Sequence, residues 1–227
     1  MKKIVLLVAV LSSLGISAQT KTELKTHFEA YYEQMKKQGD MQGIINAMTH
    51  LDVLEPSQAR KDTLAYLYVT EGRNMEALNT IGIEKNPTDT NMNVEVKAIA
   101  LKALNQPKRA LEHYQELFKR MPSPNLAYEI ADLKLQTEDI AGAKADIEYG
   151  LANVKDDMKR TFYETQQPYQ TSLRAALLYL KALAIFSENQ NENVESSLAI
   201  MNRALAIDPN FNLAKISKDA LLSRQKE

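Results

Sequence analysis

The chain has 227 residues and is close to neutral, with 28 lysines and arginines, 29 aspartates and glutamates and a formal net charge of -1. This balance argues against the basic surface on which nucleic-acid affinity depends. The absence of cysteine excludes disulfides, thiolate metal sites and lipid attachment at a cysteine. The histidines His27, His50 and His113 are too far apart in the sequence to form a local metal motif. We therefore expect no metal, no cofactor and no nucleic-acid partner.

The first 18 residues have the parts of a secretory signal peptide. Lysines follow the first methionine, Ile4–Leu11 is apolar, and Ala18 is a small residue at a plausible cleavage site. The apolar run is far shorter than the roughly 20 residues that cross a bilayer, and no later segment is long and apolar enough to do so. We expect cleavage before Gln19, no membrane span after that cleavage, and a periplasmic or secreted location.

The rest of the chain has the composition and spacing of helices. Glycine and proline number only seven each, and apolar residues recur three and four positions apart. Turn-like stretches around Gly39, Gly72, Asn105 and Glu138 recur about every 33 residues, which is the signature of a repeat. Each is followed at a fixed distance by Ile44, Ala77, Ala110 or Ala143, and one helical turn later by Met48, Ile81, Tyr114 or Ile147.

This pattern resembles the tetratricopeptide repeat (TPR) family, whose unit of about 34 residues is a pair of antiparallel helices. The resemblance covers Lys25 to about Asp157. Two departures are Tyr32, at the small site of the first unit, and Lys97, where an apolar residue is expected. The family's small first-helix site is occupied here by Ala65, Ala98 and Ala131, and its closing proline by Pro56 and Pro122.

The resemblance implies an all-α fold, a solenoid of antiparallel helix pairs forming a TPR-like superhelix with a C-terminal capping helix. We expect a signal peptide over 1–18, four helix pairs over 19–157, and a connector, a final helical hairpin and the capping helix over 158–227. An ordinary helical bundle is the alternative, but its helices have no reason to share a regularly spaced turn. The helices expected in the last region are 171–186, 194–207 and 211–224.

The stretch from Met158 to Gln170 is aromatic and polar, with no helical period. It is either a connector folded over the core or a functional loop, and we favour the connector because loops of this length usually pack on their own aromatics.

The resemblance also indicates where a partner would bind. In the family, two positions of each first helix point into a concave groove. Most of the matching residues are acidic, so we expect a basic or basic-apolar partner segment. The alternative, that these acids only form the solvated side of amphipathic helices, stays open. The positions are Glu29, Glu33, Asp62, Tyr66, Glu95, Ile99, Tyr128 and Asp132.

The sequence contains none of the common catalytic motifs, such as a glycine-rich phosphate loop, HExxH or a nucleophile elbow. The lysines, arginines and asparagines with which some TPR proteins clamp acidic peptide termini are also missing from the groove positions. We therefore expect a non-enzymatic scaffold or adaptor that binds another protein or peptide and has no catalytic residue. The alternative is a carrier for a small ligand, with a pocket near residues 162–180.

Overall fold

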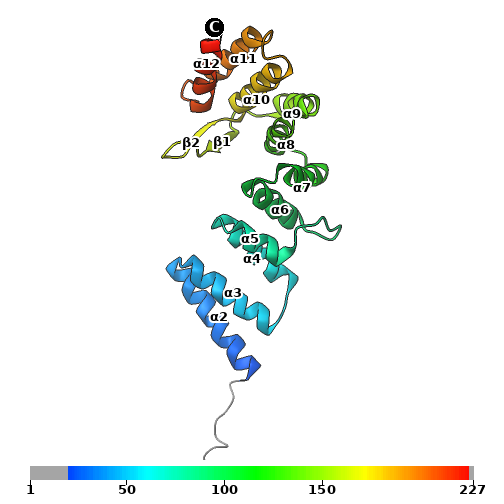
Figure 1. Ribbon diagram of the computed structural model, residues 1–227. Coiled ribbons are helices and arrows are strands. Elements are labelled where there is room, and N and C mark those ends of the chain that lie inside the picture. The colour runs from blue at the N-terminus through cyan, green and yellow to red at the C-terminus, as the bar shows by residue number, and fades with distance from the viewer. Residues whose placement is uncertain (1–19, 225–227) are drawn as a thin grey trace, which may run out of the picture. The chain divides into compact units, whose positions relative to one another are not determined.

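The computed structural model describes residues 20–224, so the expected signal peptide lies outside the described residues. The chain folds into antiparallel helix pairs and one short β-hairpin (Figure 1). It divides into two compact units on either side of the bond between Ile81 and Gly82. We refer to residues 20–81 as the N-terminal unit and to residues 82–224 as the C-terminal unit.

The N-terminal unit contains two helix pairs. In each pair the first helix packs against the second, and α3 also packs against α4. Ile45, Met48 and Leu64 form the buried centre of this unit. Its helices are α2 (Lys21–Gln38), α3 (Met41–Leu54), α4 (Gln58–Thr70) and α5 (Asn74–Ile81).

The C-terminal unit contains three helix pairs, a β-hairpin and a last helix. The pairs are α6 with α7, α8 with α9, and α10 with α11; each later pair packs on the one before it, and α12 packs on α11. The hairpin lies between α9 and α10 in the chain. The bounds are α6 (Asn91–Ala103), α7 (Pro107–Arg120), α8 (Pro124–Gln136), α9 (Ile140–Asn153), β1 (Lys159–Phe162), β2 (Tyr169–Ser172), α10 (Leu173–Glu188), α11 (Val194–Ile207) and α12 (Asn212–Arg224).

Short polar side chains fix where many of the helices begin. Thr20 and Glu23 form a reciprocal capping box at the start of α2, which satisfies two amide donors that the helix leaves without a partner. At four other helices a single N-cap side chain accepts a hydrogen bond from a backbone N–H of the first turn. These caps are Asp40, Thr90, Ser123 and Asp139.

The turn inside each of the first four pairs has the same left-handed backbone. The four turn residues have φ values of 69° at Gly39, 72° at Gly72, 55° at Asn105 and 64° at Glu138. A residue in this conformation ends a helix and lets the chain reverse. The repeating turn expected from the sequence is therefore confirmed at each of its four positions.

Glu138 occupies a conformation that glycine adopts without steric cost. Replacing Glu138 by glycine should raise the free energy of unfolding by about 0.5 to 1 kcal/mol, because relief of the left-handed strain exceeds the added entropy of the unfolded chain. Urea unfolding followed by circular dichroism measures the change. Glu138→Ala removes the same carboxylate but keeps the Cβ atom, so an equal gain in that variant would contradict this explanation.

Small residues lie where paired helices approach each other. Ala65, Ala98 and Ala131 have no exposed surface, and neither have Ala77, Ala110 and Ala143 in the second helices. Gly150 serves a similar purpose between α9 and α10, since a Cβ atom added there would lie 2.7 Å from Cδ2 of the buried Leu177. The pattern of small residues thus sets the spacing of the helices.

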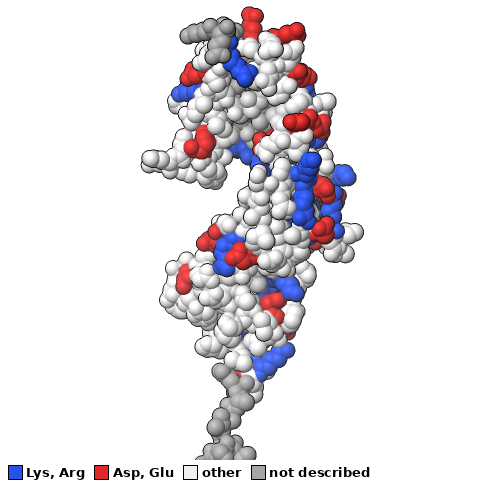
Figure 2. All heavy atoms as spheres, in the orientation of Figure 1, with Lys and Arg blue, Asp and Glu red and all other residues white. Residues whose placement is uncertain are grey.

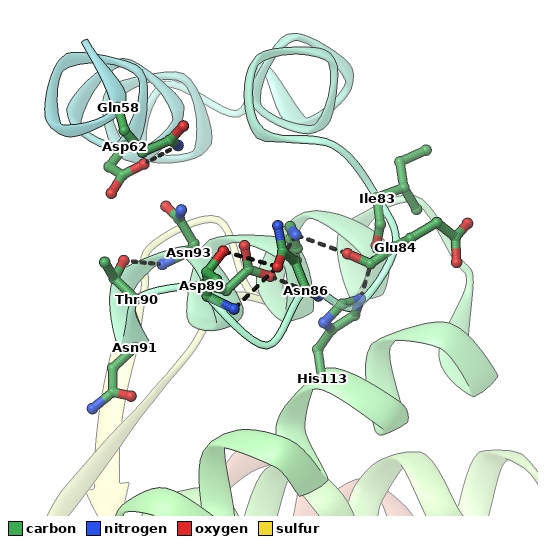
Figure 3. A network of polar contacts seen from close by, with 12 residues as sticks. Gln58, Asp62, Ile83, Glu84, Asn86, Asp89, Thr90, Asn91, Asn93 and His113 are labelled. Atoms are coloured by element: carbon green, nitrogen blue, oxygen red, sulfur yellow. Dashed lines mark hydrogen bonds and ion pairs between the residues drawn. The ribbon is translucent and has the colours of Figure 1, made fainter.

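One linker differs from the others. Helix α5 has 8 residues, against 14 in α3, and a polar segment, Gly82–Thr90, separates it from α6. Lys97 of α6 holds this segment in place although it stands where an apolar residue was expected. Its side chain is 1% exposed, and its Nζ atom donates hydrogen bonds to Asp89 Oδ2 at 2.6 Å and to the carbonyl oxygen of Glu84 at 2.8 Å. Figure 3 labels these two acceptor residues.

The last helices follow the sequence expectation with small shifts. Helix α11 has the expected bounds, and Phe211, Ala214 and Leu221 are buried. Helix α10 begins at Leu173 instead of Thr171, because the preceding residues form β2. The connector at residues 158–170 thus forms most of a β-hairpin, which the sequence analysis did not foresee, while the all-α solenoid of helix pairs is confirmed as the fold class.

Candidate partner-binding surface

In the N-terminal unit, three of the four residues expected to face a partner are exposed. Glu29 and Glu33 lie on the surface of α2, and the side chain of Tyr66 on α4 is 50% exposed. Asp62 is mostly buried and accepts a hydrogen bond from Nε2 of Gln58 at 2.8 Å. This unit therefore presents one large aromatic side chain and two carboxylates at the expected positions.

The two carboxylates on α2 each have a lysine of the same helix nearby. Glu29 Oε1 lies 3.9 Å from Lys25 Nζ, and Glu33 Oε1 lies 3.5 Å from Lys36 Nζ. Exposed pairs of this kind contribute little free energy. The carboxylates can therefore exchange these lysines for the cations of a partner at small cost.

In the C-terminal unit, the expected positions fall into two groups. Glu95 and Ile99 on α6 are at the surface, and Ile99 is 37% exposed. On α8, Tyr128 is only 4% exposed and Asp132 is half-buried. The guanidinium of Arg160, from β1, lies over the Tyr128 ring at 4.0 Å from its centroid. A partner could touch Tyr128 only if Arg160 moved away.

Arg160 and Asp132 belong to a compact group of charges, which we call the Arg160 cluster. It consists of Arg160, Glu129, Lys102, Asp132 and the underlying Tyr128. Arg160 Nη1 lies 2.7 Å from Glu129 Oε1. Lys102 Nζ lies 2.7 Å from Glu129 Oε2 and 2.6 Å from Asp132 Oδ2. Two cations and two carboxylates balance, so Asp132 adds no uncompensated negative charge to this surface.

Burial and pairing act in opposite directions on the ionisable groups of the cluster. Burial disfavours the charged form of Glu129, but the charges of Arg160 and Lys102 outweigh this effect and lower its pKa. For Lys102, burial is likewise outweighed by Glu129 and Asp132, so its pKa is raised. Burial raises the pKa of the Tyr128 hydroxyl. Glu129 and Lys102 are therefore both favoured in their charged forms by this arrangement.

The β-hairpin that supplies Arg160 is fixed to the helices around it. Phe162 is buried, with its ring centroid 6.4 Å from that of Tyr128 on α8 and 5.1 Å from that of Phe211 before α12. On the other strand, Thr171 donates a hydrogen bond to Asp208. The hairpin was not among the expected elements, although β-branched and aromatic residues on both sides of a polar turn are a signal of one.

The tip of the hairpin projects into solvent. Tyr163 is 75% exposed, and residues 165–170 carry no charged side chain. Figure 2 accordingly shows a white projection at the hairpin seen in Figure 1. Behind it, Tyr169 is half-buried and its hydroxyl donates a hydrogen bond to Glu164.

The carrier alternative predicts a pocket near residues 162–180, a range that contains Tyr163 and Tyr169. A cavity of about 450 Å³ in the C-terminal unit involves Arg174 and Leu178 of this region, but neither tyrosine lines it. Its lining combines three cations and one carboxylate with an apolar floor. The residues are Glu148, Leu151, Arg174, Leu178, Lys181, Arg203, Ala206 and Ile207.

Residues 20–224 contain neither a membrane-spanning helix nor a cluster of metal ligands. None of the helices there has the length and apolar character needed to cross a membrane. Across the same residues, no group of three or more histidine, aspartate or glutamate side chains is arranged to hold a metal ion.

Comparison with known proteins identifies the fold by structure. No family sequence model and no curated protein sequence matches the chain. A solved tetratricopeptide repeat protein from Parabacteroides merdae ATCC 43184 superposes with a TM-score of 0.65 at 16% identity, covering 88% of this chain and 72% of its own. YrrB, described as a TPR protein with an unusual peptide-binding site, superposes with a TM-score of 0.64 at 14% identity. The match covers 85% of this chain and 90% of YrrB. The chain therefore has a tetratricopeptide-repeat-like fold, built from antiparallel helix pairs.

Proposed function

We propose that this protein is a non-enzymatic scaffold or adaptor that binds a segment of another protein on the exposed surface of its first helices. The observation that carries the proposal is the exposure of Tyr66 and Ile99 at two of the expected positions, one in each unit. Large apolar side chains beside polar ones are typical anchors of protein interfaces. The TPR-like fold supports the proposal, because stacked helix pairs present extended surfaces that suit an elongated segment.

The chemistry of this surface favours a basic or basic-apolar segment. Glu29 and Glu33 are exposed in the N-terminal unit, and Glu95 is exposed near Ile99 in the C-terminal unit. Carboxylates at such positions speed the encounter with a basic segment, and the apolar side chains supply the buried contact. In this proposal Tyr128 and Asp132 contribute less to binding of the partner segment, since both belong to the Arg160 cluster.

Export to the periplasm or the exterior is part of the proposal and rests on the sequence of residues 1–18. Mass spectrometry of the protein recovered from its native cells should find an amino terminus at Gln19. Recovery of a chain that still begins at Met1, from cells that secrete other proteins normally, would overturn the export of this protein.

The binding surface can be tested with the tagged mature protein. Affinity purification from native cells should recover a stoichiometric protein companion. With the purified companion, Tyr66→Ala and Ile99→Ala should each weaken the affinity by about tenfold, as expected when an interface anchor is truncated. Titration calorimetry or fluorescence anisotropy measures the change.

The matched control is Val53→Ala on α3. Val53 is 77% exposed but lies on a second helix, so its truncation should change the affinity by less than about twofold. An equal loss in this control, or no loss in the two first-helix variants, would contradict the proposed surface. Reversal of Glu29 and Glu33 to lysine tests the charge of the partner, because a basic segment should lose affinity and an acidic one should gain it.

A further inference from the structure

The hydrogen-bond pattern of the hairpin shows which main-chain groups its strands leave unpaired. The strands are antiparallel, with Arg160 opposite Thr171 and Phe162 opposite Tyr169. In the same register, the backbone N–H of Leu173 donates to the carbonyl oxygen of Met158 at 2.9 Å. Hydrogen-bonded pairs alternate along an antiparallel ladder. Arg160 and Phe162 therefore pair with β2, and the main chain of Lys159 and Thr161 points away from it.

The contacts of the inward-facing side chains show where each edge of the hairpin lies. On β1, Arg160 is bonded to Glu129 of α8 and Phe162 packs on Tyr128 of the same helix. On β2, Thr171 is bonded to Asp208, which follows α11, and the Tyr169 hydroxyl accepts a hydrogen bond from the N–H of Leu213 at 3.5 Å. The outer edge of β1 thus lies on the α8 side of the hairpin, and that of β2 on the α12 side (Figure 1).

The edge of β1 is available for pairing. Within residues 20–224 the sheet has two strands, and the main chains of Lys159 and Thr161 make no hydrogen bond outside it. A strand edge of this kind presents N–H and C=O groups whose natural complement is another extended main chain. The Arg160 cluster holds β1 in position before any partner arrives, so little ordering entropy opposes pairing.

We propose that β1 is a docking edge, at which an extended segment of the partner protein adds a third strand to the hairpin on the α8 side. The inference rests on the proposed function, since the same segment would continue along α8 towards the exposed Ile99 of α6. The outer face of the hairpin is polar, with Thr161, Gln170 and Ser172 beside the single charged side chain of Lys159. That face suits a segment rich in β-branched and polar residues.

The short length of β1 selects a partner segment over a second copy of the chain. Lys159 and Thr161 together offer only a few main-chain hydrogen bonds, and a stable dimer buries far more surface than such a strand can cover. A segment that also contacts the first helices obtains the rest of its binding free energy there. The exposed Lys159 side chain works against edge-to-edge association of identical hairpins, because two such edges would bring lysines together.

Proline substitution at either edge separates docking from folding. Thr161→Pro removes an outward N–H from β1 and blocks a third strand, but leaves the bonds between β1 and β2 intact. Gln170→Pro makes the same change on the outer edge of β2 and is the matched control.

The probes are peptides selected from a random display library on the immobilised wild-type protein. Thr161→Pro should weaken their binding by about tenfold or more, the effect of losing one or two hydrogen bonds, and Gln170→Pro by less than about twofold.

Hydrogen exchange supplies a second measurement that needs no variant. In the wild-type protein, the amides of Lys159 and Thr161 should gain protection when the peptide binds, and the amide of Gln170 should not. Equal losses in the two proline variants, no loss in Thr161→Pro, or absence of that protection would overturn the docking edge. If Tyr66→Ala or Ile99→Ala still weakens the binding of the same peptides, the proposed function stands without the docking edge. Pairing of β1 with a second copy, seen as a dimer lost in Thr161→Pro, would also overturn the proposal.

Discussion

Replacing Lys97 by methionine should lower the free energy of unfolding of the C-terminal unit by about 3 kcal/mol, although methionine suits the apolar position of the repeat pattern. The substitution leaves the carboxylate of Asp89, whose side chain is 7% exposed, without its charged partner. Removing one member of a buried ion pair typically costs about 3 to 5 kcal/mol. Urea unfolding of the wild type and the variant measures the difference.

The double variant Lys97→Met with Asp89→Asn tests the reason for this loss. Removing both charges should recover much of the stability, because replacement of a whole buried pair is often close to neutral. Asp89→Asn alone should be destabilising, since it leaves a buried ammonium group. If the two single changes simply add in the double variant, the pair is not coupled and the explanation is wrong.

Lys97 is one of the basic side chains that hold the polar linker between α5 and α6 against the helices. His113 is buried, and its Nε2 atom lies 3.0 Å from the carbonyl oxygen of Ile83. Burial of the imidazole lowers the pKa of His113, so the neutral ring that donates to this carbonyl is favoured. Arg120 Nη1 donates to the carbonyl oxygen of Asp89 at 2.7 Å. Three basic side chains thus satisfy backbone carbonyls that the short α5 leaves outside any helix.

The parts of the fold that the sequence predicted are those encoded by neighbouring residues. The turns at Gly39, Gly72, Asn105 and Glu138 are local signals. The ends of α11 are likewise marked by the polar residues before Val194 and by Pro209 after it. Such signals need no knowledge of distant contacts, and their period revealed the helix pairs.

The features that sequence analysis missed depend on residues far apart in the chain. The hairpin is stabilised by Phe162 packing on Tyr128 and on Phe211, contacts that only the folded chain brings together. The same holds for the candidate site, where Lys102 and Arg160 come from outside α8 to neutralise its carboxylates. A repeat pattern can assign Asp132 to a helix face, but it cannot show that a lysine 30 residues earlier is bonded to it.

The second large effect is expected at Glu129, the member of the Arg160 cluster that is bonded to both cations. Glu129→Gln should lower the free energy of unfolding at neutral pH by about 2 kcal/mol, somewhat less than for a fully buried pair because the Glu129 side chain is 18% exposed. Arg160 would lose its only carboxylate partner among the described residues, whereas Lys102 would keep Asp132. Urea unfolding at several pH values measures the effect.

The pH dependence of this loss follows from the lowered pKa of Glu129 in the folded chain. A carboxylate with a lowered folded pKa adds stability above the pKa it has when unfolded, and that stability disappears as the pH falls through the folded value. The difference in the free energy of unfolding between the wild type and Glu129→Gln should therefore have its full size above about pH 5 and become smaller below it. Glu95→Gln, at an exposed position of α6, should leave the stability nearly unchanged throughout. A gap that stays constant down to low pH would show that the ion pairs of Glu129 do not stabilise the hairpin, and that Phe162 and its aromatic neighbours hold it alone.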